Sequence, residues 1–148
     1  MRKAVRAIIL KDDALLVMHR NKFGKEYDIL IGGGVEIGET PEIALLREIN
    51  EETGVAVTQP RLVFVERAGA PYGDQLIFLC RYVSGEPLLD KSTTEYKIDM
   101  MGLNRYAPLW RSLTDLETTE FRSPTLKRAI LDGIKHGFPD QPIDITNT

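Results

Sequence analysis

Three glutamates near the middle of a chain of 148 residues, Glu48, Glu51 and Glu52, have a spacing that could do chemistry. At about 100° per residue they fall within an arc of about 100° on one side of a helix. A solvated acidic face is the more frequent explanation of such a cluster. However, an all-oxygen set without His or Cys also suits a hard cation such as Mg²⁺ or Mn²⁺. A metal bound there would invert the local charge and let the site accept a phosphate chain.

A glycine-rich stretch precedes these glutamates. Gly33, Gly38 and Thr40 have the spacing of a phosphate-binding P-loop, but Glu39 stands where that motif requires a lysine. A carboxylate has the wrong charge to hold a phosphate directly. The loop is therefore expected to lie beside carboxylates and not beside a cation.

Capping signals place the glutamates on a helix from Pro41 to Thr53. Thr40 is a suitable N-cap, a proline is tolerated in the first turn, and Gly54 is a typical stop. The apolar side of this helix, expected to face the core, consists of Ile43, Leu46 and Ile49.

Short apolar runs around this helix predict a sheet. Strands are expected at residues 5–10, 14–19, 27–31, 61–66, 75–83 and 106–110. A short helix is predicted at 112–117, and an amphipathic helix from Ser123 and Pro124 to Gly137. Residues 84–105 are polar and are treated as a loop. Residues 138–148 contain two prolines and are expected to form a loose tail.

The composition fits a single domain over residues 1–148, since roughly 100–200 residues per domain is usual. The formal net charge is −3, and residues 36–52 alone hold six acids and one base. A protein that covers nucleic acid or an anionic membrane usually has the opposite sign, so neither partner is expected. No apolar run approaches the ~20 residues of a membrane helix. A cytoplasmic protein is therefore expected.

The spacing of residues 33–55 resembles the signature box of the Nudix hydrolase family. The matching positions are Gly33, Glu39, Arg47, Glu48, Ile49, Glu51, Glu52, Gly54 and Val55. The resemblance implies an α/β fold, an α/β/α sandwich around a mixed β-sheet, with the box as a loop–helix–loop. It also implies hydrolysis of a pyrophosphate bond in a nucleoside diphosphate linked to another moiety, such as a nucleoside triphosphate, ADP-ribose or a dinucleoside polyphosphate.

The same resemblance assigns roles inside the box. Glu48, Glu51 and Glu52 resemble ligands of Mg²⁺, with Mn²⁺ as an alternative, and the carbonyl oxygen of Gly32 resembles a further ligand. Glu48 and Glu52 are also taken as catalytic. The structural positions of the box, where Glu39 is expected to pair with Arg47, are Gly33, Glu39, Arg47 and Gly54.

The resemblance also suggests roles for residues outside the box, although no motif fixes their positions. A carboxylate on a later loop often serves as general base, and Glu95 is the candidate, with Glu48 as the alternative. Arg20 ends a strand where the family often places a phosphate-contacting arginine, although a surface arginine explains it equally well. Tyr72 falls where dinucleoside-polyphosphate hydrolases carry a marker, but a turn explains it too. Arg122 replaces an asparagine of oxidised-purine readers, which argues against that substrate.

Three classes of function are left open, of which an isomerase on a similar scaffold would need extra catalytic residues that the sequence does not identify. The first is the hydrolase acting on a small phosphorylated nucleotide. The second is a non-catalytic module that senses a nucleotide on the same fold, against which the intact glutamates argue. Homodimers are common in this fold, so a homodimer is kept as an alternative to a monomer.

Overall fold

The computed structural model describes residues 3–69, 73–88 and 104–146. The strands of its sheet are β1 (Lys3–Lys11), β2 (Ala14–Lys22), β3 (Lys25–Gly34), β4 (Ala56–Arg67), β5 (Asp74–Ser84), β6 (Asn104–Ser112) and β7 (Ile143–Asp144). The helices are α1 (Pro41–Thr53), α3 (Leu113–Leu116) and α4 (Pro124–His136). Every predicted strand and helix is present, and most of the strands are longer than predicted.

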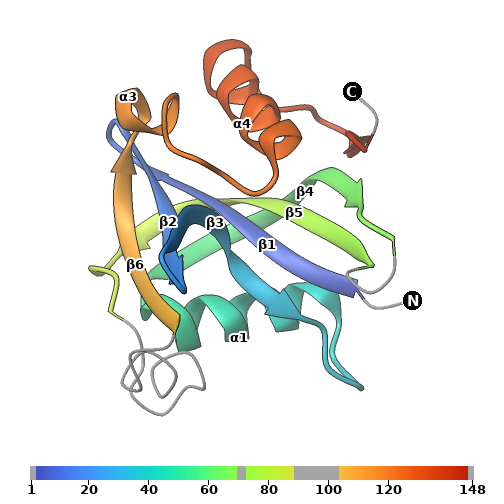
Figure 1. Cartoon of the computed structure of the whole chain (residues 1–148). Helices are drawn as coiled ribbons and strands as arrows, with labels where there is room; N and C mark the ends of the chain where they lie inside the picture. The colour runs from blue at the N-terminus through green and yellow to red at the C-terminus, as the bar shows by residue number, and fades with distance from the viewer. Residues whose placement is uncertain (1–2, 70–72, 89–103, 147–148) are drawn as a thin grey trace.

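The strands form one mixed sheet between two helical layers. Its order is β6-β2-β3-β1-β5-β4-β7, with β1 parallel to β5 and the other long strands paired antiparallel. Figure 1 shows α1 covering one face of the sheet and α4, with α3 beside it, lying over the other. The predicted α/β/α sandwich around a mixed sheet is therefore confirmed.

Alternation along the strands divides the core between these two layers, because successive side chains point to opposite faces of a sheet. Val5, Ala7 and Ile9 pack on the α1 side, whereas Ile8 belongs to the cluster that includes Leu126 and Ile130 of α4. All these side chains are buried. The apolar character on both faces explains why the strands read as nearly continuous hydrophobic runs.

A segment between α3 and α4 completes the sheet beside β3. β1 pairs with β3 from Ala4–Gly34 to Ala7–Ile31, and the earlier part of β3 meets the α3–α4 linker instead. Asp28 N donates to the carbonyl oxygen of Glu120 at 2.9 Å, and Arg122 N donates to the carbonyl oxygen of Asp28 at 3.0 Å. The linker is thus fixed where α4 begins.

The orientation of α1 differs from the prediction. Ile49 is buried as expected, but Ile43 and Leu46 are 55% and 45% exposed. Glu52, by contrast, is buried, with only 5% of its surface exposed. The face against the sheet consists of Ala44, Leu45, Ile49, Glu52 and Thr53. The predicted caps are present: Thr40 Oγ1 accepts from Ile43 N at 3.2 Å, and Gly54 has a φ of 70°.

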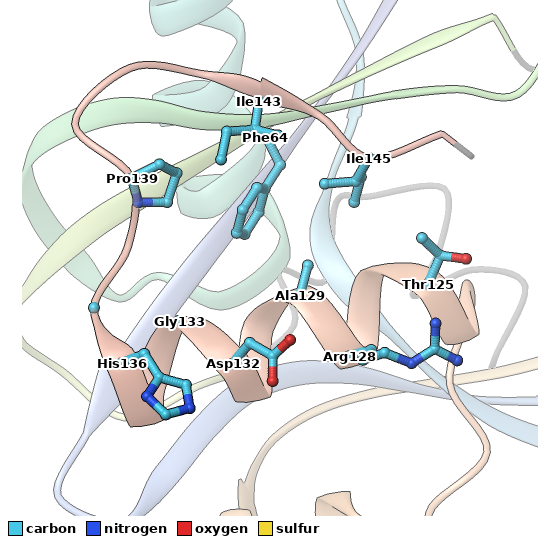
Figure 2. Close-up of a pocket in the computed structure, with 11 residues that line it drawn as sticks. Phe64, Thr125, Arg128, Ala129, Asp132, Gly133, His136, Pro139, Ile143 and Ile145 are labelled. Atoms are coloured by element: carbon cyan, nitrogen blue, oxygen red, sulfur yellow. The ribbon is translucent and has the colours of Figure 1, made fainter. Parts of the chain in front are cut away.

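The expectation of a loose tail is wrong for the described part of it. β7 pairs in parallel with β4, and Ile145 N donates to the carbonyl oxygen of Val65 at 2.9 Å. Ile145 is only 4% exposed, so it adds to the core on the α4 side. Figure 2 shows the returning segment beside α4. Burial of this isoleucine and pairing with the edge of the sheet hold the segment in place.

Candidate active site

Arg47 is the centre of the polar cluster on α1. Its Nε and Nη2 donate to both carboxylate oxygens of Glu39, at 2.7 and 2.9 Å, and Nη2 also donates to the carbonyl oxygen of Gly34 at 3.1 Å. These hydrogen bonds from Arg47, helped by the backbone N–H of Glu36, lower the pKa of Glu39 to about 2. The bidentate pair fastens the loop of residues 34–40 to the helix that follows it.

The remaining nitrogen of the same guanidinium lies between two of the predicted metal ligands. Arg47 Nη1 donates to Glu48 Oε1 at 2.9 Å and to Glu51 Oε2 at 3.3 Å. Burial, and then the negative charge of Glu48, raise the pKa of Glu51. Glu36 lies 3.8 Å from Nη2. The carboxylates around Arg47 therefore outnumber its single positive charge.

Two glycines at the end of β3 allow this close packing. A Cβ added to Gly33 would lie 2.6 Å from Cδ of Glu48, so the glutamate occupies the space of a missing side chain. A Cβ added to Gly32 would collide with the carbonyl oxygen of Val5 on β1. Gly33 therefore admits Glu48, and Gly32 admits the neighbouring strand.

The donor set has the chemistry that a hard divalent cation requires. Glu48 and Glu51 direct carboxylate oxygens at one shared cationic nitrogen, and Glu52 lies one residue further along the helix. Over residues 3–69, 73–88 and 104–146, no three His, Cys, Asp or Glu side chains are grouped in a way that could hold a metal. In this arrangement Arg47 takes up carboxylate oxygens that a metal would need. The residue types fit Mg²⁺ or Mn²⁺. The position that Glu48 and Glu51 share is occupied by the cationic Nη1 of Arg47.

The predicted residues outside the box have different outcomes. Arg20 is described at the end of β2, where its Nη2 donates to Tyr106 Oη at 2.6 Å. Tyr72 and Glu95 lie outside the described residues. Glu86, from the same polar stretch as Glu95, forms an ion pair with Lys11 at 3.1 Å and accepts from Trp110 Nε1 at 3.2 Å.

A cavity of about 430 Å³ lies beside the middle of β3, at Tyr27, Ile29 and Leu30, and was not predicted from the sequence. Its polar lining consists of Arg6, Arg20, Tyr27, Glu66, Gln75, Arg122 and Ser123. No residue of the box lines it, but Arg6 in its lining is paired with Gly32 across the two strands. Arg20 and Arg122 were singled out from the sequence, but only the fold brings them to one cavity.

A second cavity, of about 400 Å³, lies between α4 and the C-terminal segment. Figure 2 shows its lining, which includes Phe64, Ala129, Gly133 and Ile145. None of the residues of the box lines it. It is therefore separate from the candidate active site.

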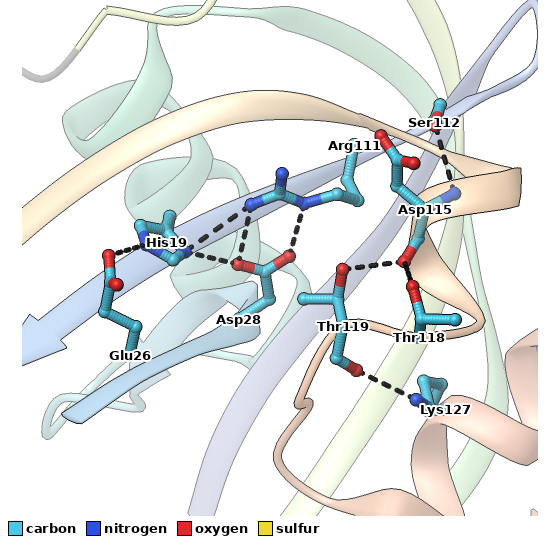
Figure 3. Close-up of polar contacts among 9 residues, drawn as sticks. All are labelled: His19, Glu26, Asp28, Arg111, Ser112, Asp115, Thr118, Thr119 and Lys127. Atoms are coloured by element: carbon cyan, nitrogen blue, oxygen red, sulfur yellow. Dashed lines mark hydrogen bonds and ion pairs between the residues drawn. The ribbon is translucent and has the colours of Figure 1, made fainter.

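A buried ion pair supports the linker next to the first cavity (Figure 3). Asp28 is fully buried and accepts from Arg111 Nε at 2.8 Å and Nη2 at 3.2 Å. His19 Nδ1 lies 2.7 Å from Asp28 Oδ1, and its Nε2 lies 3.0 Å from Glu26 Oε1. The sequence did not predict this group, because Asp28 and Arg111 are far apart in the chain.

The family model of the NUDIX domain matches residues 1–127, and the chain belongs to the Nudix hydrolase family. Among the relatives it matches is the NAD-capped RNA hydrolase NudC of Klebsiella pneumoniae, 34% identical over 83 residues that cover 56% of this chain and 32% of that protein. The chain thus spans about a third of the length of such curated relatives.

Solved structures share the fold over most of the chain. An ADP-ribose pyrophosphatase from Streptococcus suis has a TM-score of 0.65 and 19% identity, covering 97% of this chain and 96% of that one. A NUDIX hydrolase from Nitrosomonas europaea has a TM-score of 0.66 and 23% identity, covering 93% and 90% of the two chains. At these identities the likeness concerns the fold alone.

None of the described helices has the length and apolar character needed to cross a membrane.

Proposed function

We propose that this chain hydrolyses a pyrophosphate bond in a nucleoside diphosphate linked to another moiety, and that the reaction depends on a divalent metal ion. The observation that carries the proposal is the convergence of Glu48 and Glu51 on Arg47 Nη1, directly beside the glycines that end β3. The family supports the reaction class, and the names of relatives and structural neighbours point to dinucleotide caps and ADP-ribose as substrates to try.

Glu48, Glu51 and Glu52, with the carbonyl oxygen of Gly32, would hold Mg²⁺ or Mn²⁺. Such an ion neutralises the charge of the diphosphate oxygens and activates the attacking water. The chain's own residues then have distinct tasks. Arg47 and Glu39 hold the loop on the helix, and Gly33 leaves room for Glu48. Glu48 or Glu95 would accept the proton of the water as general base.

The cavity that Arg6 and Arg20 line would hold the rest of the substrate. Arg20 lines it, in keeping with the expected contact to the substrate, and Tyr72 is kept as a second candidate. The proposal favours a small phosphorylated substrate and a cytoplasmic protein. Because the NudC relatives are named for capped RNA, the expectation against nucleic-acid polymers stays a prediction. So does a homodimer, which light scattering after size-exclusion chromatography tests.

A substrate screen tests the proposed reaction. ADP-ribose, NADH, dinucleoside polyphosphates, nucleotide sugars and nucleoside triphosphates are incubated with the chain and Mg²⁺, and new phosphomonoesters are detected after a coupled phosphatase. Turnover is expected for at least one class, lost with EDTA and restored by excess Mg²⁺ or Mn²⁺. Tight nucleotide binding without any metal-dependent product would instead support the non-catalytic sensing module.

A further inference from the structure

The cavity of about 430 Å³ beside β3 has a cationic lining. Three arginines from separate elements line it, Arg6 on β1, Arg20 on β2 and Arg122 just before α4. Glu66 is the one carboxylate in the lining, and its Oε2 accepts from Ser123 Oγ at 2.5 Å. The lining therefore has a formal excess of positive charge.

Arg20 is held by aromatic rings in place of a carboxylate. Its guanidinium carbon lies 4.4 Å from the ring centre of Tyr106 and 5.7 Å from that of Tyr27. Its Nε is buried and has no hydrogen-bond partner among the residues that the structure describes. A buried donor without an acceptor costs free energy, and an anion in the cavity would supply an acceptor.

Arg122 stands over the same aromatic ring. Its guanidinium carbon is 4.3 Å from the ring centre of Tyr27, and it forms no ion pair with any described residue. The backbone of Arg122 is fixed by its hydrogen bond to Asp28, which Arg111 anchors in turn. A rigid linker thus presents this free positive charge at the cavity.

The third arginine, Arg6, has an amide side chain and a backbone carbonyl among its partners. Arg6 Nε donates to Gln75 Oε1 at 3.2 Å, and Nη1 donates to the carbonyl oxygen of Leu30 at 3.2 Å. The backbone of Arg6 pairs with that of Gly32, whose carbonyl oxygen is a proposed metal ligand. The inference takes the diphosphate at the proposed metal ligands and the attached group in the cavity that Arg6 lines.

We propose that this cavity binds an anionic group, a phosphate or a carboxylate, on the moiety attached to the diphosphate. The chain then selects substrates that carry negative charge beyond the bond that is cleaved. This inference rests on the proposed function for the position of the diphosphate. The competing occupant is a neutral nucleobase stacked on Tyr27, and the test distinguishes the two.

The test is a binding measurement without metal, so that it does not depend on turnover. Isothermal titration calorimetry in EDTA compares two matched pairs, AMP with adenosine 2′,5′-bisphosphate and UDP-glucose with UDP-glucuronate. The first pair differs by a phosphate and the second by a carboxylate. We expect the more anionic member of at least one pair to bind about tenfold more tightly, as one charge-assisted hydrogen bond would give.

Two variants locate the effect. Arg122→Gln, at an exposed side chain that is expected to leave the fold intact, should reduce that ratio severalfold while the affinity for the less charged member changes little. Arg128→Gln, at an exposed position on α4, is the matched control and should leave the ratio unchanged.

Three results would overturn the inference: equal affinities within both pairs, no binding of any of the four ligands, or an unchanged ratio in Arg122→Gln. If Arg122→Gln lowers the affinity for both members of a pair equally, the ratio is unchanged, and the cavity is assigned to a nucleobase. If the ratio holds but no substrate is hydrolysed, the proposed function fails and the anion site stands.

Discussion

Glu48 and Gly33 fit together as a side chain and the space left by a missing one. A Cβ on Gly33 would lie 2.6 Å from Glu48 Cδ and 2.6 Å from its Oε1. The contact joins the end of β3 to the acidic face of α1. It is compatible with the orientation of the helix, which leaves Ile43 and Leu46 exposed.

Gly33→Ala tests this contact. The new methyl group must displace the Glu48 carboxyl, and misplacing a catalytic group by about 1 Å can cost about 100-fold in rate. We expect kcat to fall by about that factor while the melting temperature changes little, because the displaced group is the end of a flexible side chain. Gly32→Ala is the contrast: its Cβ meets backbone of β1, so it should lower the melting temperature markedly. Full activity in Gly33→Ala would contradict the placement of Glu48.

Glu39 should make stability depend on acid pH. Hydrogen bonds from Arg47 lower its pKa from 4.5 to about 2. A carboxyl with a lowered pKa stabilises the fold above its unfolded value of 4.5, and this contribution is lost as the pH falls through about 2. Glu39→Gln should remove that part of the dependence of melting temperature on pH, whereas Glu42→Gln, at an exposed position in the first turn of α1, should retain it. Identical curves for wild type and Glu39→Gln would contradict the pair.

His19 should contribute at higher pH with the opposite sign. Burial lowers its pKa, but hydrogen bonds with Glu26 and Asp28 outweigh this effect and raise the pKa above 6.5. The stabilisation is therefore complete below pH 6.5 and is lost as the pH rises through the raised value. Chemical denaturation across this range should show a loss of stability in wild type and in His136→Gln, and a flatter profile in His19→Gln. A stability that rises with pH in this window would refute the assignment.

The C-terminal segment should stabilise the domain. Ile145 is 4% exposed and packs in the core on the α4 side, so Ile145→Ala should cost about 2–5 kcal/mol of unfolding free energy by urea denaturation. Ile143→Ala, at a side chain that is 47% exposed, is the control and should cost much less. Equal small effects would mean that the segment contributes little to stability.

The sequence predicted what local signals encode. Thr40, Pro41 and Gly54 defined α1 to the residue, because capping depends on neighbours in the chain. The burial of Glu52 was not predicted, since it depends on how α1 packs against the sheet. The cationic cavity was missed for a similar reason. It is assembled from β1, β2 and the linker before α4, and only the pairing of the strands brings these residues together.

Hydrolysis by Glu52→Gln, compared with Glu42→Gln on the same helix, tests the central claim most directly. Both changes remove one carboxylate from α1, but only Glu52 belongs to the proposed metal site. With the best substrate from the screen and Mg²⁺ in excess, we predict that Glu52→Gln lowers kcat by at least about 100-fold with an unchanged circular dichroism spectrum, and that Glu42→Gln retains wild-type activity. Wild-type turnover by folded Glu52→Gln would contradict a metal-dependent reaction at this box.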